Sequence, residues 1–298
     1  MGRETVPLLV EKLVLELSKI TEKFEIILVD DYSPDNSWEI IQTEAEKDIR
    51  VKGIRLSRNF GQHKAITAGL SSANGEYTIV MDCDLQDDPV YIHDLMAEAK
   101  KGFDIVYTIK ERRKHGFFKN LQARIFNYVF NFLADSKSMH ADSQIGAYSL
   151  ITKKVVKEFL KFGDQRRHYL MVLRWLGFSN TYIRIQHLER KHGKSSYTLA
   201  KLINHAIDGI TAHSDKVLIL TVYSGFFLSM LSMIFAIAIV AMYFHHGFQA
   251  GWTSLFVVIL FFSGVIITTV GIVGVYVGRT FEQSKGRQLF IIDKKLNL

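Results

Sequence analysis

Hydrophobic and polar residues follow two different periods in the first third of the chain. Short runs rich in β-branched residues predict buried strands at 25–29, 51–56 and 77–81. Segments with helical spacing separate them, at 7–20, 38–46 and 61–72. In the first of these helices, apolar residues recur at Leu9, Leu13 and Leu17. Strands that alternate with helices are typical of a mixed, mostly parallel sheet covered on both faces, so we expect an α/β fold.

Two long apolar segments dominate the last third of the chain. Residues 217–244 and 252–277 contain no charged side chain. Each exceeds the roughly 20 residues that a helix needs to cross a bilayer, so we expect two transmembrane helices. Lys and Arg flank the pair on its outer ends, whereas the connection at 245–251 carries neither. The positive-inside rule then predicts a multi-pass protein of the cell (inner) membrane whose N-terminal region is cytoplasmic.

Two further stripes of apolar residues have helical spacing and a fringe of Lys and Arg, at 117–133 and within 197–216. Such helices can lie in the membrane interface, and packing onto the domain core is the alternative. The expected organisation is a cytosolic domain that includes the first stripe, an interfacial helix, two transmembrane helices and a cytosolic tail. Their bounds are 1–196, 197–216, 217–244, 252–277 and 278–298.

The formal net charge of +7 limits the classes of partner. A basic chain fits an anionic membrane face or a phosphate-bearing substrate. Nucleic acid is not expected, because no recognised binding motif accompanies the charge. The single cysteine, Cys83, excludes an intramolecular disulfide and fits a reducing cytosolic domain.

Acidic residues follow two of the predicted strands. Asp30 and Asp31 end the first, and Asp82 and Asp84 end the third. Residues two apart in an extended chain face the same way, at the sheet end where open α/β folds bind ligands. Adjacent carboxylates repel unless a cation lies between them, and oxygen ligands suit Mg²⁺ or Mn²⁺. From these residues alone, an acidic turn ahead of a helix is the alternative.

A third motif, Arg58-Asn59-Phe60-Gly61, opens the helix predicted at 61–72. The amino end of a helix carries unpaired N–H groups and partial positive charge, which favour phosphate. Together the three motifs resemble family 2 glycosyltransferases of GT-A fold. The stretches that carry the resemblance are 29–35, 58–61 and 81–89.

The C-terminal half resembles one group within that family. Residues 142–148 are similar to its acceptor-side motif, and 190–197 to the Arg-x-x-Gly-x-Ser-x-Tyr segment before the membrane. With two terminal apolar segments, the chain resembles the polyprenyl-phosphate glycosyltransferases, which include dolichol-phosphate mannose synthase and GtrB-type glucosyltransferases. The resemblance covers roughly 24–278, most of the chain.

The resemblance implies a cell-envelope enzyme that moves a monosaccharide from a nucleotide-diphosphate sugar to undecaprenyl or dolichyl phosphate, with inversion. It implies Mg²⁺ or Mn²⁺ on the donor pyrophosphate and, by analogy, a homo-oligomer such as a tetramer. Uridine and guanosine donors both occur in such families. The implied donor-nucleotide residues are Asp30, Asp31, Gly61 and Asp82, and the implied metal residues are Asp82, Asp84 and Gln86. The implied acceptor and pyrophosphate residues are Arg124, Arg190, Lys194 and Ser195.

Asp142 is the implied catalytic residue, and two roles are open for it. The usual proposal is a general base that deprotonates the acceptor. A phosphate monoester has a second pKa near 6, so the nucleophile is mostly ionised at neutral pH without a base. Asp142 would then position the acceptor or the sugar hydroxyls.

Family members open with a strand near the sheet centre, whereas this chain begins in what resembles the following helix. Either the sequence starts downstream of the natural start, or this strand is lacking. Two rival functions are a processive polysaccharide synthase and an inactive membrane scaffold or flippase partner. Two membrane helices are few for a polymer pore, and 165–169 differs from the Gln-x-x-Arg-Trp signature in its final residues. Against an inactive scaffold, every inner acid is present.

Overall fold

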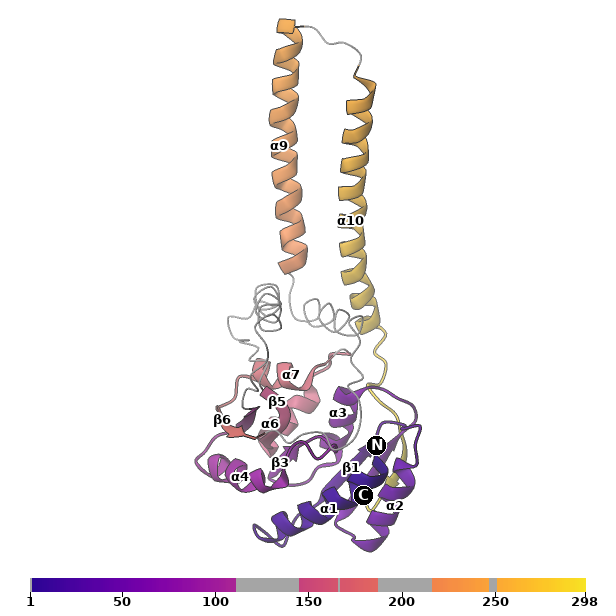
Figure 1. Ribbon diagram of the computed structural model, residues 1–298, viewed down its shortest axis with the longest axis vertical. Helices are drawn as coiled ribbons and strands as arrows, with labels where there is room; N and C mark the ends of the chain where they lie inside the picture. The colour runs from indigo at the N-terminus through magenta and orange to yellow at the C-terminus, as the bar shows by residue number, and fades with distance from the viewer. Residues whose placement is uncertain (1, 111–144, 166, 187–215, 247–250) are drawn as a thin grey trace. The chain divides into compact units, whose positions relative to one another are not determined.

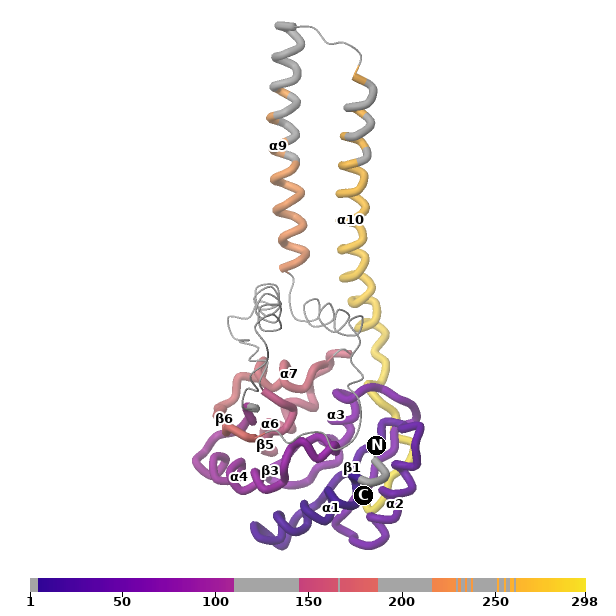
Figure 2. The backbone as a smooth tube through the Cα atoms, in the orientation of Figure 1, coloured from indigo at the N-terminus to yellow at the C-terminus, as the bar shows by residue number. Residues whose placement is uncertain are grey.

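The computed structural model describes residues 2–110, 145–165, 167–186, 216–246 and 251–298 (Figure 1). The predicted amphipathic stripes at 117–133 and 197–216 lie outside these residues. The chain divides into two compact units. The first unit holds the described residues up to 186 and the last twelve, 287–298, and the second holds the described part of 203–286. Figure 2 shows that both ends of the described chain, indigo and yellow, belong to the first unit.

The first unit is a mixed α/β structure, which confirms the predicted fold class. Its helices are α1 (Gly2–Ser18), α2 (Ser37–Lys47), α3 (Gln62–Ser72), η1 (Pro89–Tyr91), α4 (Ile92–Lys100), α6 (Lys153–Lys161) and α7 (Tyr169–Leu176). Its strands are β1 (Ile26–Asp30), β2 (Val51–Leu56), β3 (Tyr77–Val80), β4 (Ile105–Lys110), β5 (Ile145–Thr152), β6 (Asn180–Ile185) and β7 (Ile292–Leu296).

The strands form two sheets, in the orders β1-β2-β7 and β3-β5-β4-β6. β1 pairs parallel with β2, and β4 pairs parallel with β6. The other three pairings among the described strands are antiparallel, because β5 and β7 run against their neighbours. The sheets are therefore mixed, as expected, although parallel pairs are not the majority among the described strands.

β1 and β3 are each the outermost strand on one side of their sheet. Among the described strands, β1 pairs with β2 alone and β3 with β5 alone. The strand that the resemblance places near the sheet centre has no counterpart in the described part of the chain. One apolar cluster nevertheless joins these two outer strands. Leu9 and Leu13 of α1 pack in it together with Leu28 of β1 and Ile79 of β3.

The final strand, β7, falls within the segment that the sequence pattern assigned to a cytosolic tail. It pairs with β2, and Asn297 just beyond it donates to the carbonyl oxygens of Ala45 (2.8 Å) and Val51 (2.9 Å). A Cβ atom on Gly53 of β2 would lie 2.8 Å from Leu296 Cδ1, so the close approach of β7 favours glycine there. Residues 292–298 therefore complete a sheet of the first unit, a pairing that the sequence pattern did not predict, and the cytosolic location of this segment stays a prediction.

The second unit contains two long helices, α9 (Lys216–His246) and α10 (Trp252–Ser284). Both predicted apolar segments are thus helical. Among the residues searched within the described chain, Phe261–Ser284 is the one helix long and apolar enough to cross a membrane, with mean hydropathy 1.9. Lys216–Leu228 is apolar but shorter. A pair of transmembrane helices stays a prediction.

Candidate active site

The candidate site lies at one edge of the four-stranded sheet. β3 and β4 both run antiparallel to β5, and β6 runs parallel to β4. The carboxyl ends of β3, β4 and β6 and the amino end of β5 therefore lie at the same edge. Asp82 and Asp84 follow β3 at this edge. It is the edge at which open α/β sheets bind ligands.

Five predicted site residues lie outside the described residues: Arg124, Asp142, Arg190, Lys194 and Ser195. The segment 111–144 leaves the sheet at the carboxyl end of β4 and returns at the amino end of β5. The segment 187–215 leaves the sheet at the carboxyl end of β6. Both segments therefore join the sheet at the edge of Asp82 and Asp84, and the roles of their residues stay predictions.

Asp30 ends β1 with its side chain buried. Its Oδ1 accepts the Ser33 N–H (2.9 Å), and its Oδ2 lies 3.5 Å from Arg55 Nε. Arg55 is the β2 residue directly opposite Asp30 in the parallel register. Asp30 thus closes the turn after β1 and pairs with a neighbouring strand, so its described contacts are structural.

Asp31 holds the loop that leads into α3. Its Oδ1 accepts the Phe60 N–H (2.7 Å) and its Oδ2 accepts the Gly61 N–H (2.8 Å). Gly61 precedes the first residue of α3 with φ at 95°, a conformation that favours glycine. A carboxylate oxygen can accept more than one hydrogen bond, so Asp31 retains acceptor capacity for a ligand hydroxyl.

The first residue of α3 reaches the acids after β3. Gln62 Nε2 donates to Asp82 Oδ1 at 2.8 Å. Asp84 Oδ1 accepts the backbone N–H of Gln86 at 3.1 Å, and Leu85 between them has φ at 61°. The two acid pairs predicted from the sequence are thus linked, from Asp31 through the loop before α3 to Gln62 and Asp82.

Gln62 was not predicted from the sequence. Its only signal was its place at the start of a helix between the two acid motifs, and amide side chains are common on helix surfaces. A second contact that sequence reasoning missed joins His63 of α3 to His168, which precedes α7. Their ring centroids are 4.0 Å apart, and the Tyr169 N–H donates to His63 Nδ1 at 3.4 Å.

The donor set after β3 fits a hard divalent cation. Within the described residues, no group of three or more His, Cys, Asp or Glu side chains gathers to make an all-protein cage. Mg²⁺ and Mn²⁺ favour oxygen ligands, and Mg²⁺ usually binds proteins through one or two carboxylates, with phosphate oxygens and water completing its shell. Asp82 and Asp84, with the Gln86 side-chain oxygen, supply ligands of that kind.

Cys83 lies between Asp82 and Asp84 in the sequence. Cys83 as a residue is exposed, yet burial of its thiol, followed by the charges of Asp82 and Asp84, raises the pKa of that thiol. The two carboxylate charges thus add to the larger effect of burial. A cation bound there would lower their mutual repulsion.

Asp88, four residues after Asp84, has structural partners. Asp88 Oδ1 accepts the Val90 N–H (3.2 Å) and caps η1. The hydroxyl of Tyr148, a buried residue of β5, donates to the Asp88 carbonyl oxygen at 3.2 Å. These contacts fix the loop after Asp84 against the central strand of the four-stranded sheet.

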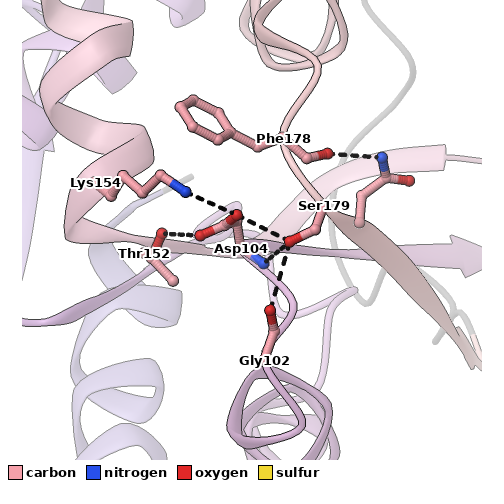
Figure 3. A network of polar contacts seen from close by, with 7 residues as sticks. Gly102, Asp104, Thr152, Lys154, Phe178 and Ser179 are labelled. Atoms are coloured by element: carbon pink, nitrogen blue, oxygen red, sulfur yellow. Dashed lines mark hydrogen bonds and ion pairs between the residues drawn. The ribbon is translucent and has the colours of Figure 1, made fainter.

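A different acidic site lies at the opposite edge of this sheet, where β4 and β6 begin (Figure 3). Asp104 Oδ2 accepts hydrogen bonds from Ser179 Oγ (2.9 Å) and Lys154 Nζ (3.3 Å), and its Oδ1 accepts one from Thr152 Oγ1 (3.4 Å). Burial raises the pKa of Asp104, but the three hydrogen bonds and the Lys154 charge outweigh it, so the net pKa is lowered. This network ties β4, β5 and β6 together and is structural.

The family described as Glycosyl transferase family 2 matches residues 4–160. The uncharacterized glycosyltransferase YkcC of Bacillus subtilis (strain 168) is 32% identical over 284 residues, covering 95% of this chain and 87% of the relative. An undecaprenyl-phosphate 4-deoxy-4-formamido-L-arabinose transferase of Yersinia pestis (strain Pestoides F) is 31% identical, with coverage of 98% and 90%. The protein of the same name from Pseudomonas fluorescens (strain SBW25) is 32% identical, with coverage of 99% and 86%.

Proposed function

Because the chain belongs to glycosyltransferase family 2, we propose that it is a membrane-bound, inverting enzyme that transfers a monosaccharide from a nucleotide-diphosphate sugar to a polyprenyl phosphate. The observation that carries the proposal is the polar link from Asp31 through Gly61 and Gln62 to Asp82. This link joins residues that the sequence predicted for the nucleotide and for the metal, which supports a single site for the donor diphosphate.

The choice of acceptor draws on two observations. Two relatives that align over nearly the whole chain are named for transfer to undecaprenyl phosphate. The chain also has two helices of 31 and 33 residues, one of which includes a segment apolar enough to cross a membrane. A polyprenyl phosphate has a charged head and a long apolar tail, so its enzyme needs both a phosphate site and an anchor at the bilayer.

On the donor side, the amino end of a helix carries partial positive charge and favours phosphate, so the start of α3 would donate to an oxygen of the diphosphate. Asp82, Asp84 and Gln86 would hold Mg²⁺ or Mn²⁺ against the diphosphate. When bound, the metal supplies Lewis-acid stabilisation of the negative charge on the leaving nucleotide diphosphate. Gln62 holds the Asp82 carboxylate in place from α3.

We propose a single displacement. An oxygen of the lipid phosphate forms a bond to the anomeric carbon of the sugar while the bond from that carbon to the nucleotide diphosphate breaks, so the configuration inverts. Asp142 positions the acceptor or takes a proton from it. Arg124, Arg190, Lys194 and Ser195 offset the repulsion between the acceptor phosphate and the donor diphosphate. Catalysis then rests on positioning and electrostatic stabilisation.

We propose that the domain within 1–196 is cytoplasmic, that 197–216 is interfacial, and that 217–244 and 252–277 both span the inner membrane. The chain then returns to the cytoplasm, which is required for β7 to pair with β2. A homo-oligomer, such as a tetramer, belongs to the same proposal by analogy with the polyprenyl-phosphate group.

The test is an assay of membranes that contain the full chain. They are incubated with undecaprenyl or dolichyl phosphate, a panel of nucleotide sugars, and Mg²⁺ or Mn²⁺, with EDTA as the control. We expect a lipid-linked monosaccharide from one donor, and none in EDTA. A polymeric product would favour the processive synthase, and absence of product with every donor would favour an inactive scaffold.

A further inference from the structure

Tyr32 has an unfavourable backbone conformation at the end of β1. Its φ is 57°, in the left-handed region that non-glycine residues seldom adopt. Its large side chain is also 50% exposed. Neither feature favours folding, because glycine would adopt this backbone at lower cost and a smaller side chain would expose less apolar area. Such outliers tend to gather at functional sites.

A cation supports the ring of Tyr32. The Arg55 guanidinium carbon lies over the Tyr32 ring, 5.2 Å from its centroid, and 5.9 Å from the centroid of the Trp38 ring. Arg55 is held by Asp30, at 3.5 Å, and Trp38 is only 3% exposed. The Tyr32 ring therefore packs on Arg55, which is itself in contact with Asp30 and the buried Trp38, while Tyr32 stays 50% exposed.

Tyr32 is also placed among the predicted donor residues. It follows Asp31, whose carboxylate bonds the loop before α3. It precedes Ser33, whose N–H donates to the Asp30 carboxylate. A nucleotide whose diphosphate lies at the amino end of α3 would extend its ribose and base from that point. An exposed aromatic ring beside Asp31 offers a flat surface within the site.

We infer that the exposed face of Tyr32 stacks against the nucleobase of the sugar donor. This inference rests on the proposed function, because it takes a nucleoside diphosphate as the ligand. Stacking on an aromatic side chain tolerates different bases, since every base has a π face. Tyr32 thus contributes affinity for the nucleoside and leaves the choice of base to other residues.

Two substitutions separate this role from a structural one. Tyr32→Gly removes the ring and relieves the left-handed backbone, so we expect a thermal unfolding midpoint at or above that of the wild type. We also expect an affinity for the nucleoside diphosphate about 10-fold weaker. Tyr32→Phe keeps the ring and should bind within about 2-fold of the wild type. A ring present only for stability predicts the opposite for Tyr32→Gly, a lower midpoint and unchanged affinity.

The measurement is isothermal titration of the detergent-solubilised full chain with UDP, GDP, ADP, CDP and dTDP in the presence of Mn²⁺. If the wild type binds one of them and Tyr32→Gly binds it equally well, the stacking role is wrong and the proposed function stands. Equal losses in Tyr32→Phe and Tyr32→Gly would likewise overturn it, because the ring would not be the determinant. If the wild type binds none of the five, the proposed function fails and the stacking role fails with it.

Discussion

The two edges of the four-stranded sheet carry carboxylates in different surroundings. At one edge, Asp104 accepts hydrogen bonds from two hydroxyl groups and from the Lys154 ammonium (Figure 3). At the other edge, Asp82 accepts a hydrogen bond from the exposed side-chain amide of Gln62. Asp84 accepts a hydrogen bond from the backbone N–H of Gln86 in its own loop. A cationic donor both orients a carboxylate and offsets its charge, whereas a neutral amide orients it and leaves the charge in place.

Asp104 therefore has the contacts of a structural acid, whereas Asp82 is bonded to the first residue of α3, within the candidate site. The bonds of Asp104 join three strands and pair its charge with the Lys154 ammonium. Asp82 and Asp84 follow β3 two residues apart and supply carboxylate oxygens, which are the ligands that a divalent cation on a diphosphate requires. Asp31 is intermediate, since it holds the loop before α3 and still has acceptor capacity.

The largest effect on stability and activity together is expected for Asp31→Ala. It removes the acceptor of two backbone N–H groups at once, and the loop before α3 loses its anchor. We expect a loss of about 2 kcal/mol in the free energy of unfolding, measured by thermal unfolding in detergent. Donor binding should weaken in parallel, because Gln62 follows that loop. An unchanged midpoint would show that the loop is held by other contacts.

A smaller effect is expected when Asp104 loses its charge. Its folded pKa is lowered from 3.8, so its contribution is present above pH of about 4 and disappears as the pH falls through the folded pKa. Asp104→Asn should therefore be less stable than the wild type by about 1 kcal/mol at pH 7. At pH 3 the difference between the two should be smaller, and transfer activity at pH 7 should be normal. A difference that grows at low pH would contradict the assignment.

The smallest effect is expected for Gln62→Ala, because its hydrogen bond to Asp82 is exposed. An exposed amide–carboxylate bond contributes about 1 kcal/mol or less, so the apparent affinity for Mn²⁺ in the presence of donor should fall about 3- to 5-fold. Gln62→Met is the matched variant, since it keeps the length of the side chain and removes the amide that donates to Asp82. It should bind Mn²⁺ no better than Gln62→Ala if the contact orients Asp82. Equal Mn²⁺ affinity in the wild type and Gln62→Ala would remove Gln62 from the site.

Local patterns in the sequence predicted β1, β2 and β3, because runs of β-branched residues favour strands whatever their partners. The predicted burial holds for β1 and β2, whereas β3 is only partly buried and begins at the exposed Tyr77. They did not predict β7, whose sequence Ile-Asp-Lys-Lys-Leu is charged and exposed. Its pairing with β2 depends on Gly53, more than 200 residues earlier, where the absence of a Cβ lets Leu296 approach. Contacts of such separation leave no periodic signal.

Within the candidate site, too, the sequence predicted local placement and missed contacts between distant segments. The alternation of side chains along a strand placed Asp82 and Asp84 together at the end of β3. It did not reveal that Asp31 would bond Phe60 and Gly61, since these contacts depend on how α3 packs beside β1. The roles of Asp142 and the basic residues of 187–215 rest on the family resemblance and stay predictions.

The most direct test compares two isosteric substitutions at the opposite edges of one sheet. Asp84→Asn and Asp104→Asn are assayed side by side for transfer of the sugar to polyprenyl phosphate, at equal amounts of folded protein. We predict that Asp84→Asn lowers the rate about 100-fold or more without lowering the unfolding midpoint, whereas Asp104→Asn lowers the midpoint and keeps the rate. A rate for Asp84→Asn close to that of the wild type would contradict the assignment of the metal and donor site to the end of β3.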